Sequence, residues 1–116
     1  MTFSEQKIEG FPVFELEGKI MGDKQSLILC DRLKEHINAG EKRILLDLSK
    51  VRWINSFAIG QMLSCLRQIR NNGGDLYFSG IQGRVAYYFK ITKLETELKI
   101  YENVGTALEE LTISSI

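Results

Sequence analysis

The sequence predicts an α/β fold in which a mixed β-sheet of about four or five strands is packed with about four helices. Two strand-like segments, residues 3–8 and 11–17, follow each other closely at the start of the chain. After them, short apolar runs alternate with segments of helical periodicity. Adjacent short strands form a hairpin, whereas strands separated by helices are joined by parallel crossovers. The expected sheet is therefore a hairpin extended by parallel strands.

Length and charge narrow the class of protein. The chain has 116 residues, enough for a real core, so residues 1–116 are expected to form a single domain. Lys plus Arg and Asp plus Glu each number 15, which argues against nucleic acid as the main partner. No apolar run approaches the roughly 20 residues of a membrane span, and the N-terminus lacks the pattern of a secretory signal. We expect a cytoplasmic protein without membrane insertion.

The opening hairpin comes from a weak polar strand and a stronger partner. Phe14 and Leu16 alternate with Glu15 and Glu17, which is the pattern of a half-buried strand. A glycine at position 18 breaks this run, so residues 19–22 are predicted to form a loop or a short third extended piece.

The middle of the chain holds two predicted helices around a central strand. The first helix covers residues 24–38, between an Asp23 N-cap and a Gly40 stop, and its inward face is Leu27, Cys30, Leu33 and Ile37. Residues 44–48 are apolar apart from one aspartate, which suits a strand covered on both faces. A second short extended piece and a sharp turn follow, and the second helix covers residues 57–71, with the apolar stripe Ile59, Met62, Leu63, Leu66 and Ile69.

The last third alternates strand and helix. Strands are predicted at residues 76–79 and 98–101, and helices at residues 83–91 and 104–111. The inward faces of these two helices are Val85, Tyr88 and Phe89, and Val104, Ala107, Leu108 and Leu111. Tyr87 is expected to be a core or boundary aromatic like Tyr88.

Cys30 and Cys65 both fall on apolar faces of predicted helices. We expect two buried thiols in a reducing compartment, with a disulfide or a metal pair as the alternative. No Cys and His spacing suits zinc, and no phosphate-binding glycine motif is present, so no metal and no cofactor is predicted.

The turn at Asn55-Ser56 is the candidate functional feature. Asn55 or Ser56 is expected to cap the second helix. The free N–H groups at that helix end also favour negative charge, so a phosphate on Ser56 could sit there without unfolding the helix. Phe57 is either a contact residue or folds back into the core. Gly60 permits close approach of a partner, or only tight packing of the helix on a strand.

The order of elements and the run Asn55-Ser56-Phe57-Ala58-Ile59-Gly60 resemble a STAS domain, and more narrowly an anti-sigma factor antagonist. That family's signature is Asp-Ser-Ser-Gly-hydrophobic-Gly between a strand and a helix. The segment Glu17-Gly18-Lys19-Ile20 resembles the family's turn before its first helix. The similarity extends over essentially the whole chain.

The resemblance implies a regulator that acts by protein–protein contact and is not an enzyme. Family members bind an ATP-using anti-sigma factor of the serine-kinase type, and thereby free a sigma factor. The kinase phosphorylates the serine that aligns with Ser56, and a metal-dependent serine phosphatase resets it. Asn55, Ser56, Phe57, Ala58 and Gly60 would form the docking surface, and a weak homodimer is possible within this class.

The chain departs from the signature at three positions. Asn55 stands for the aspartate, Phe57 for the second serine and Ala58 for the glycine. The alternative hypothesis is therefore an interaction subunit of the same fold that acts without phosphorylation in another regulatory complex.

Three further interpretations involve other chemistry. Asp47 ends an apolar run like the acceptor strand of a response-regulator receiver, but the first strand offers no acid pair for Mg²⁺, and Asp47 is expected to face solvent or pair with a basic residue. His36, the one histidine, is expected to be a surface residue and not a catalytic base. The turn at residues 80–83 is a weak candidate for a nucleotide loop.

Overall fold

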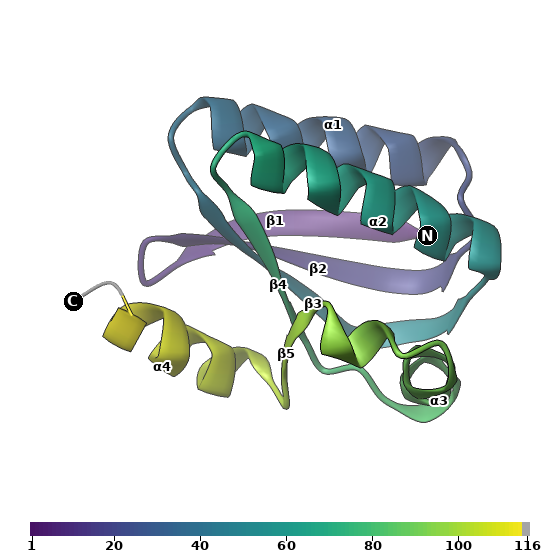
Figure 1. Ribbon diagram of the computed structural model, residues 1–116. Helices are drawn as coiled ribbons and strands as arrows, with labels where there is room; N and C mark the ends of the chain where they lie inside the picture. Colours follow the sequence, from purple (N-terminus) through teal and green to yellow (C-terminus); the bar gives the residue numbers. More distant parts are fainter. Residues whose placement is uncertain (115–116) are drawn as a thin grey trace.

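The computed structural model describes residues 1–114 and confirms the predicted α/β fold. Over these residues the chain forms five strands, four α-helices and one 3-10 helix (Figure 1). The elements are β1 (Thr2–Ile8), β2 (Phe11–Ile20), α1 (Lys24–Asn38), β3 (Arg43–Ile54), α2 (Ser56–Asn71), β4 (Asp75–Ser79), α3 (Gly83–Ile91), η1 (Leu94–Thr96), β5 (Lys99–Tyr101) and α4 (Val104–Ser114).

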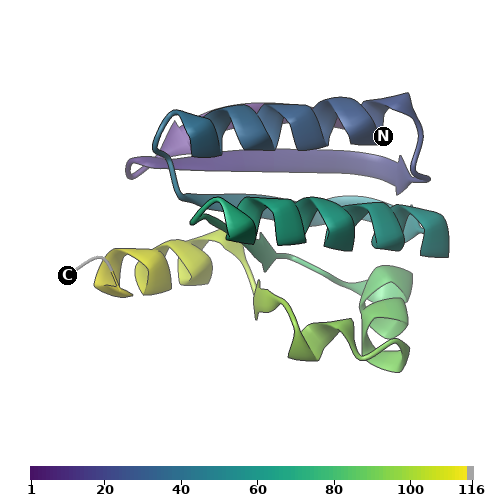
Figure 2. The same ribbon diagram turned by 45° about the horizontal axis from the view of Figure 1, so that its top comes forward.

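The sheet has the expected topology, with strand order β1-β2-β3-β4-β5. β1 pairs with β2 antiparallel, and every later pairing is parallel. Helices α1 and α2 lie side by side over one face, whereas α4 covers the other (Figures 1 and 2). Helix α3 packs near the end of β3. β2 and β3 therefore end together at one edge of the sheet, next to the start of α2, whereas β4 ends level with Asp47 in the middle of β3.

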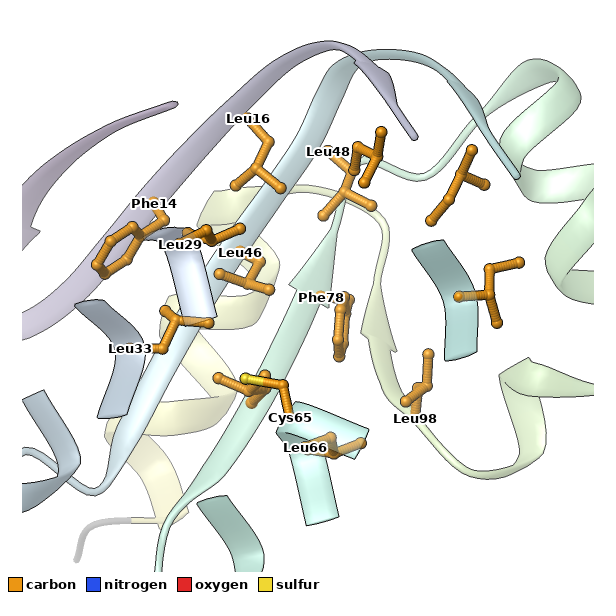
Figure 3. Close-up of a cluster of buried hydrophobic side chains, with 14 of the residues drawn as sticks. Phe14, Leu16, Leu29, Leu33, Leu46, Leu48, Cys65, Leu66, Phe78 and Leu98 are labelled. Carbon is orange, nitrogen blue, oxygen red and sulfur yellow. The ribbon is translucent and has the colours of Figure 1, made fainter. Parts of the chain in front are cut away.

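The central strand is buried on both faces, as its apolar run predicts. Phe14, Leu16, Leu46, Leu48 and Phe78 belong to the larger core beneath α1 and α2 (Figure 3). On the opposite face, the smaller core joins three strand residues to the apolar side of α4: Val13, Leu45, Tyr77, Ala107, Leu108 and Leu111. Consecutive residues of β3 thus enter different cores, since side chains of a strand alternate between faces.

Two strands are longer than predicted. β2 continues through Gly18, which adopts φ +99°, so the predicted break at Gly18 is wrong; of the two alternatives for residues 19–22, Lys19 and Ile20 take the extended one, as the end of β2 and not as a separate piece. β3 runs without interruption from Arg43 to Ile54. Its pairing with β2 shifts register twice, and each shift adds one residue to β3. Such bulges break the strict alternation of apolar residues, which is why the sequence pattern indicates two pieces.

The inward face of α1 differs from the prediction at one position. Leu27 is 55% exposed, and Leu29 takes the buried place together with Leu33 and Ile37. In α3, Tyr88 packs against the core but is only partly buried, and Tyr87 is 66% exposed and no core residue.

The expectation of two free thiols is wrong. Cys30 of α1 and Cys65 of α2 form a disulfide with a Cα–Cα distance of 6.1 Å. Each cysteine lies on an inner face of its helix, and neighbouring helices on one face of a sheet bring such positions together. The sequence pattern left this alternative open, and the relative placement of the two helices decides it.

Candidate functional site

Asn55 is the N-cap of α2 and also ties this helix to the end of β2. Its Oδ1 accepts a hydrogen bond from the Ala58 N–H at 2.8 Å. Its Nδ2 donates to the Met21 carbonyl at 3.2 Å, and its backbone N–H donates to the Ile20 carbonyl at 3.2 Å. The cap is thus provided by Asn55, so the hydroxyl of Ser56 is not needed for it.

Ser56 is the first residue of α2, and its side chain is exposed. No acidic residue occupies the first turn of this 16-residue helix. The N-terminal turn of a helix leaves backbone N–H groups without helical partners, and the aligned peptide dipoles make this end attractive to negative charge. The geometry therefore combines a solvent-accessible hydroxyl with a local field that tolerates a phosphate.

Phe57 lies at the surface beside Ser56, with 62% of the residue exposed. Its ring rests on Gly22 in the loop between β2 and α1, because a Cβ built on Gly22 would lie 2.5 Å from the ring. Gly22 has φ +78°, so both its conformation and its missing side chain make room for the ring. This support holds an apolar ring in solvent next to Ser56, which is an arrangement typical of a contact residue.

The other two predicted docking residues behave differently from each other. Ala58 is 2% exposed and belongs to the core, so its side chain is not available to a partner. Gly60 is exposed, and a Cβ built there would meet no atom within 4 Å. The idea that Gly60 serves tight packing on a strand is therefore wrong, and its face of α2 is open.

A basic concavity lies at the same sheet edge, and the sequence analysis did not identify it. It is lined by Lys19, Met21, Arg52, Trp53 and Arg84. Lys19 is paired with Trp53 across β2 and β3, and the Met21 carbonyl accepts the bond from Asn55 described above. None of the three cations forms an ion pair with residues 1–114. In the sequence, the run Arg52-Trp53 just before the turn at Asn55-Ser56 was the feature that could have indicated this concavity.

The receiver and nucleotide interpretations find no support. The Asp47 Oδ1 accepts a hydrogen bond from the Ser49 N–H at 3.0 Å and so is engaged with its own strand. The turn at residues 80–83 is held against β3, where Gln82 Nε2 donates to the Ser49 carbonyl at 2.9 Å. The concavity beside it is lined by Asp47 and Glu102 with no Lys or Arg, which disfavours a phosphate.

His36 is not a free surface residue. Its side chain is 14% exposed and lies between the carboxylates of Glu5 and Glu41, at 3.2 and 2.9 Å. The hydrogen bond from Arg32 lowers the pKa of Glu5, and that from Lys7 lowers the pKa of Glu41. The cluster ties α1 to β1 and to the loop after α1, so the role of His36 is to stabilise the fold.

Among the described residues, no group of three or more His, Cys, Asp or Glu side chains could hold a metal ion. None of the helices within residues 1–114 is both long and apolar enough to cross a membrane.

Comparison with known proteins identifies the family. The sequence model that describes the STAS domain family matches residues 3–107 of this chain. The chain belongs to the STAS domain family. An inferred anti-sigma factor antagonist from Thermotoga neapolitana, a homolog of TM1081, is 36% identical over 77 residues, which span 66% of this STAS domain and 68% of that protein.

Solved structures share the fold of this STAS domain. The crystal structure of TM1081 from Thermotoga maritima, an inferred anti-sigma factor antagonist, superposes with a TM-score of 0.80 at 23% identity and covers 93% of this chain and 92% of its own. The phosphorylated form of the Bacillus cell fate determinant SpoIIAA superposes with a TM-score of 0.70 at 13% identity and covers 95% of this chain and 99% of its own.

Proposed function

We propose that this STAS domain is a cytoplasmic anti-sigma factor antagonist that binds an anti-sigma factor of the serine-kinase type, and that phosphorylation of Ser56 ends the binding. The observation that carries the proposal is the position of Ser56, exposed at the first residue of α2 beside a helix cap that Asn55 already provides. The names of its relatives, anti-sigma factor antagonists, support the same function.

A phosphate on Ser56 would change the surface and leave the fold intact. It adds a charge of about −1.5 to −2 at neutral pH, at a helix end where negative charge is favoured by about 0.3–1 kcal/mol. Because Ser56 makes no contribution to the cap, its modification removes none of the hydrogen bonds that hold α2 to β2. The switch is thus a change of surface charge.

The partner's surface would be acidic where it meets this edge. Lys19, Arg52 and Arg84 line one concavity with Trp53 and have no ion-pair partner among residues 1–114, and the exposed ring of Phe57 offers an apolar anchor. A phosphate on Ser56 would offset part of this positive charge and repel the acidic partner. This explains how one modification could release the whole complex.

The proposal assigns no catalysis to this chain. The kinase is the anti-sigma factor itself, and a metal-dependent serine phosphatase would restore the free hydroxyl of Ser56. Both act on the domain as a substrate, so no cofactor is needed within it.

Phosphorylation is tested by incubating the purified protein with ATP and the serine kinase encoded nearest to its gene, followed by intact mass. The wild type and a Ser49→Ala control, which removes another exposed serine, should gain one phosphate. Ser56→Ala should gain none. If the wild type and Ser56→Ala are modified equally, the acceptor is another residue.

The alternative function is a STAS interaction subunit that binds its partner constitutively. The observation that favours it is Phe57, which stands in the place of the family's second serine and is 62% exposed. In that case pull-down of the partner survives both Ser56→Ala and Ser56→Asp but is weakened by Phe57→Asp. The phosphorylation switch instead requires Ser56→Asp to weaken the pull-down and Ser56→Ala to preserve it.

A further inference from the structure

A cavity of about 220 Å³ lies between α1 and α2, the two helices that run side by side over the sheet in Figure 2. Its floor includes Leu46 and Leu76 of the sheet, and the Cys30–Cys65 disulfide forms part of its wall. Several of these apolar side chains are drawn in Figure 3. Leu27, Asp31 and Ser64 in its lining are exposed, so the space opens to solvent between the two helices and a small molecule can enter it.

Two oxygen atoms in the lining are buried without a partner. Neither Ser26 Oγ nor Gln61 Oε1 has a hydrogen bond to any of residues 1–114. Ser26 lies in the first turn of α1, and Gln61 reaches across from α2, with its Oε1 3.0 Å from where a Cβ on Gly22 would stand. Buried polar atoms in native proteins are nearly always hydrogen-bonded, so this pair calls for a donor.

We propose that this cavity is a binding site for a small neutral molecule with an apolar ring and one hydrogen-bond donor, of the phenol type. An apolar cavity of about 150 Å³ holds benzene, so the available volume suits a ring with a short polar substituent. Apolar walls with a few convergent polar groups are the usual composition of a ligand pocket. A hydrogen-bond donor is required because Gln61 Oε1 can only accept, and a neutral molecule suits a lining in which one acidic residue, Asp31, is balanced by one basic residue, Lys34.

The site adjoins the surface that carries Ser56 without depending on it. Gln61 follows Phe57 by four residues and so lies one turn along the same side of α2. A molecule bound between the helices would contact the element that positions Phe57, whether or not Ser56 is ever phosphorylated.

The test uses phenol and toluene, which have similar shapes but differ in the donor. Each is titrated into the full chain, with the disulfide intact and the Leu, Ile and Met methyl groups labelled for NMR. We expect saturable binding of phenol, with shifts confined to methyl groups around the cavity. Saturable binding of toluene should be about fivefold weaker than that of phenol, the factor that a hydrogen bond of ordinary strength provides.

Two variants separate the polar contribution from the space itself. Ser26→Ala combined with Gln61→Leu removes both oxygens and should weaken phenol about fivefold while leaving toluene unchanged or tighter. Ser26→Met fills the cavity and should abolish both.

A matched control is Ser64→Ala, because Ser64 also lines the cavity but its hydroxyl already accepts a hydrogen bond from Gln68 at 3.5 Å and so does not need one from the ligand. It should leave the affinity for phenol unchanged. The melting temperature of each variant confirms that it is folded. The proposal is overturned if neither compound binds saturably, if the shifts scatter over the surface, or if the double variant binds phenol as tightly as the wild type.

Discussion

Opening the Cys30–Cys65 disulfide should destabilise the protein by an amount that follows from the spacing of the cysteines. The bond closes a loop across 35 residues between α1 and α2. The chain-entropy model gives a loss of unfolded-state entropy of about 13 cal/mol/K for such a loop, or about 3.8 kcal/mol at 25 °C. This is a large fraction of the roughly 5–15 kcal/mol that stabilises a typical domain.

The assay is urea unfolding followed by circular dichroism, with and without dithiothreitol. With an m value of about 1.5 kcal/mol/M, the loss corresponds to a midpoint about 2.5 M lower for the reduced protein. Reduction leaves both side chains in place, so no packing is removed with the bond. A Cys30→Ala and Cys65→Ala double variant should unfold near the reduced midpoint and should not respond to dithiothreitol.

The reasoning is refuted if dithiothreitol leaves the urea midpoint of the wild type unchanged while alkylation and intact mass show that the treated protein has two free thiols. Equal midpoints would mean that the unfolded chain gains no freedom from the opened loop. If alkylation modifies two thiols before any reductant is added, the helices do not carry the bond. Alkylation in intact cells would show whether the disulfide or the two thiols are present there, because cysteines of cytosolic proteins are usually kept as free thiols.

Three further predictions concern the cap, an ion pair and the basic concavity. Asn55→Ala should cost about 1 kcal/mol in urea unfolding, and Asn55→Asp, which keeps the acceptor for the Ala58 N–H but loses the Nδ2 donor to the Met21 carbonyl, should lie between Asn55→Ala and the wild type. Burial raises the pKa of Asp75, but hydrogen bonds from Lys99 and Arg70 outweigh it and hold the pKa below its ordinary 3.8. This carboxylate therefore stabilises the fold above pH 3.8 and loses that effect as the pH falls through its lower folded-state pKa. Asp75→Asn should be less stable than wild type at neutral pH, and urea unfolding at falling pH should show the gap closing; a gap that stays constant contradicts the assignment. Arg52→Glu should weaken partner binding, and the salt dependence of that binding, in a pull-down or a calorimetric titration. The control is Arg67→Glu, at an exposed arginine of α2, which should change neither quantity. Equal effects of the two substitutions would show that only the net charge of the protein matters.

The sequence was most informative where a pattern is local. The helical periodicity of α2 and the turn residues at its start predicted the helix and a cap at Asn55 or Ser56, and the structure has the cap at Asn55. The uninterrupted apolar run at residues 44–48 predicted a strand between two layers, because both of its faces must avoid water. The resemblance to the STAS family rested on the same segment.

Local patterns failed where two segments must fit each other. β3 reads as two pieces because its bulges arise from pairing a longer strand with a shorter one, and this mismatch is not visible in either strand alone. The burial of Leu29 in place of Leu27 depends on the angle at which α1 meets the sheet.

The sequence by itself determined the order of the elements, most of the apolar face of each helix and the chemistry available at Ser56. Tertiary structure alone decided that Cys30 meets Cys65, that Phe57 rests on Gly22, and that Lys19, Arg52 and Arg84 line one concavity. The physical reason is that hydrophobic periodicity fixes which side of an element is buried, but not which residue of another element lies opposite. That choice depends on strand register and helix packing, which involve residues distant in the sequence.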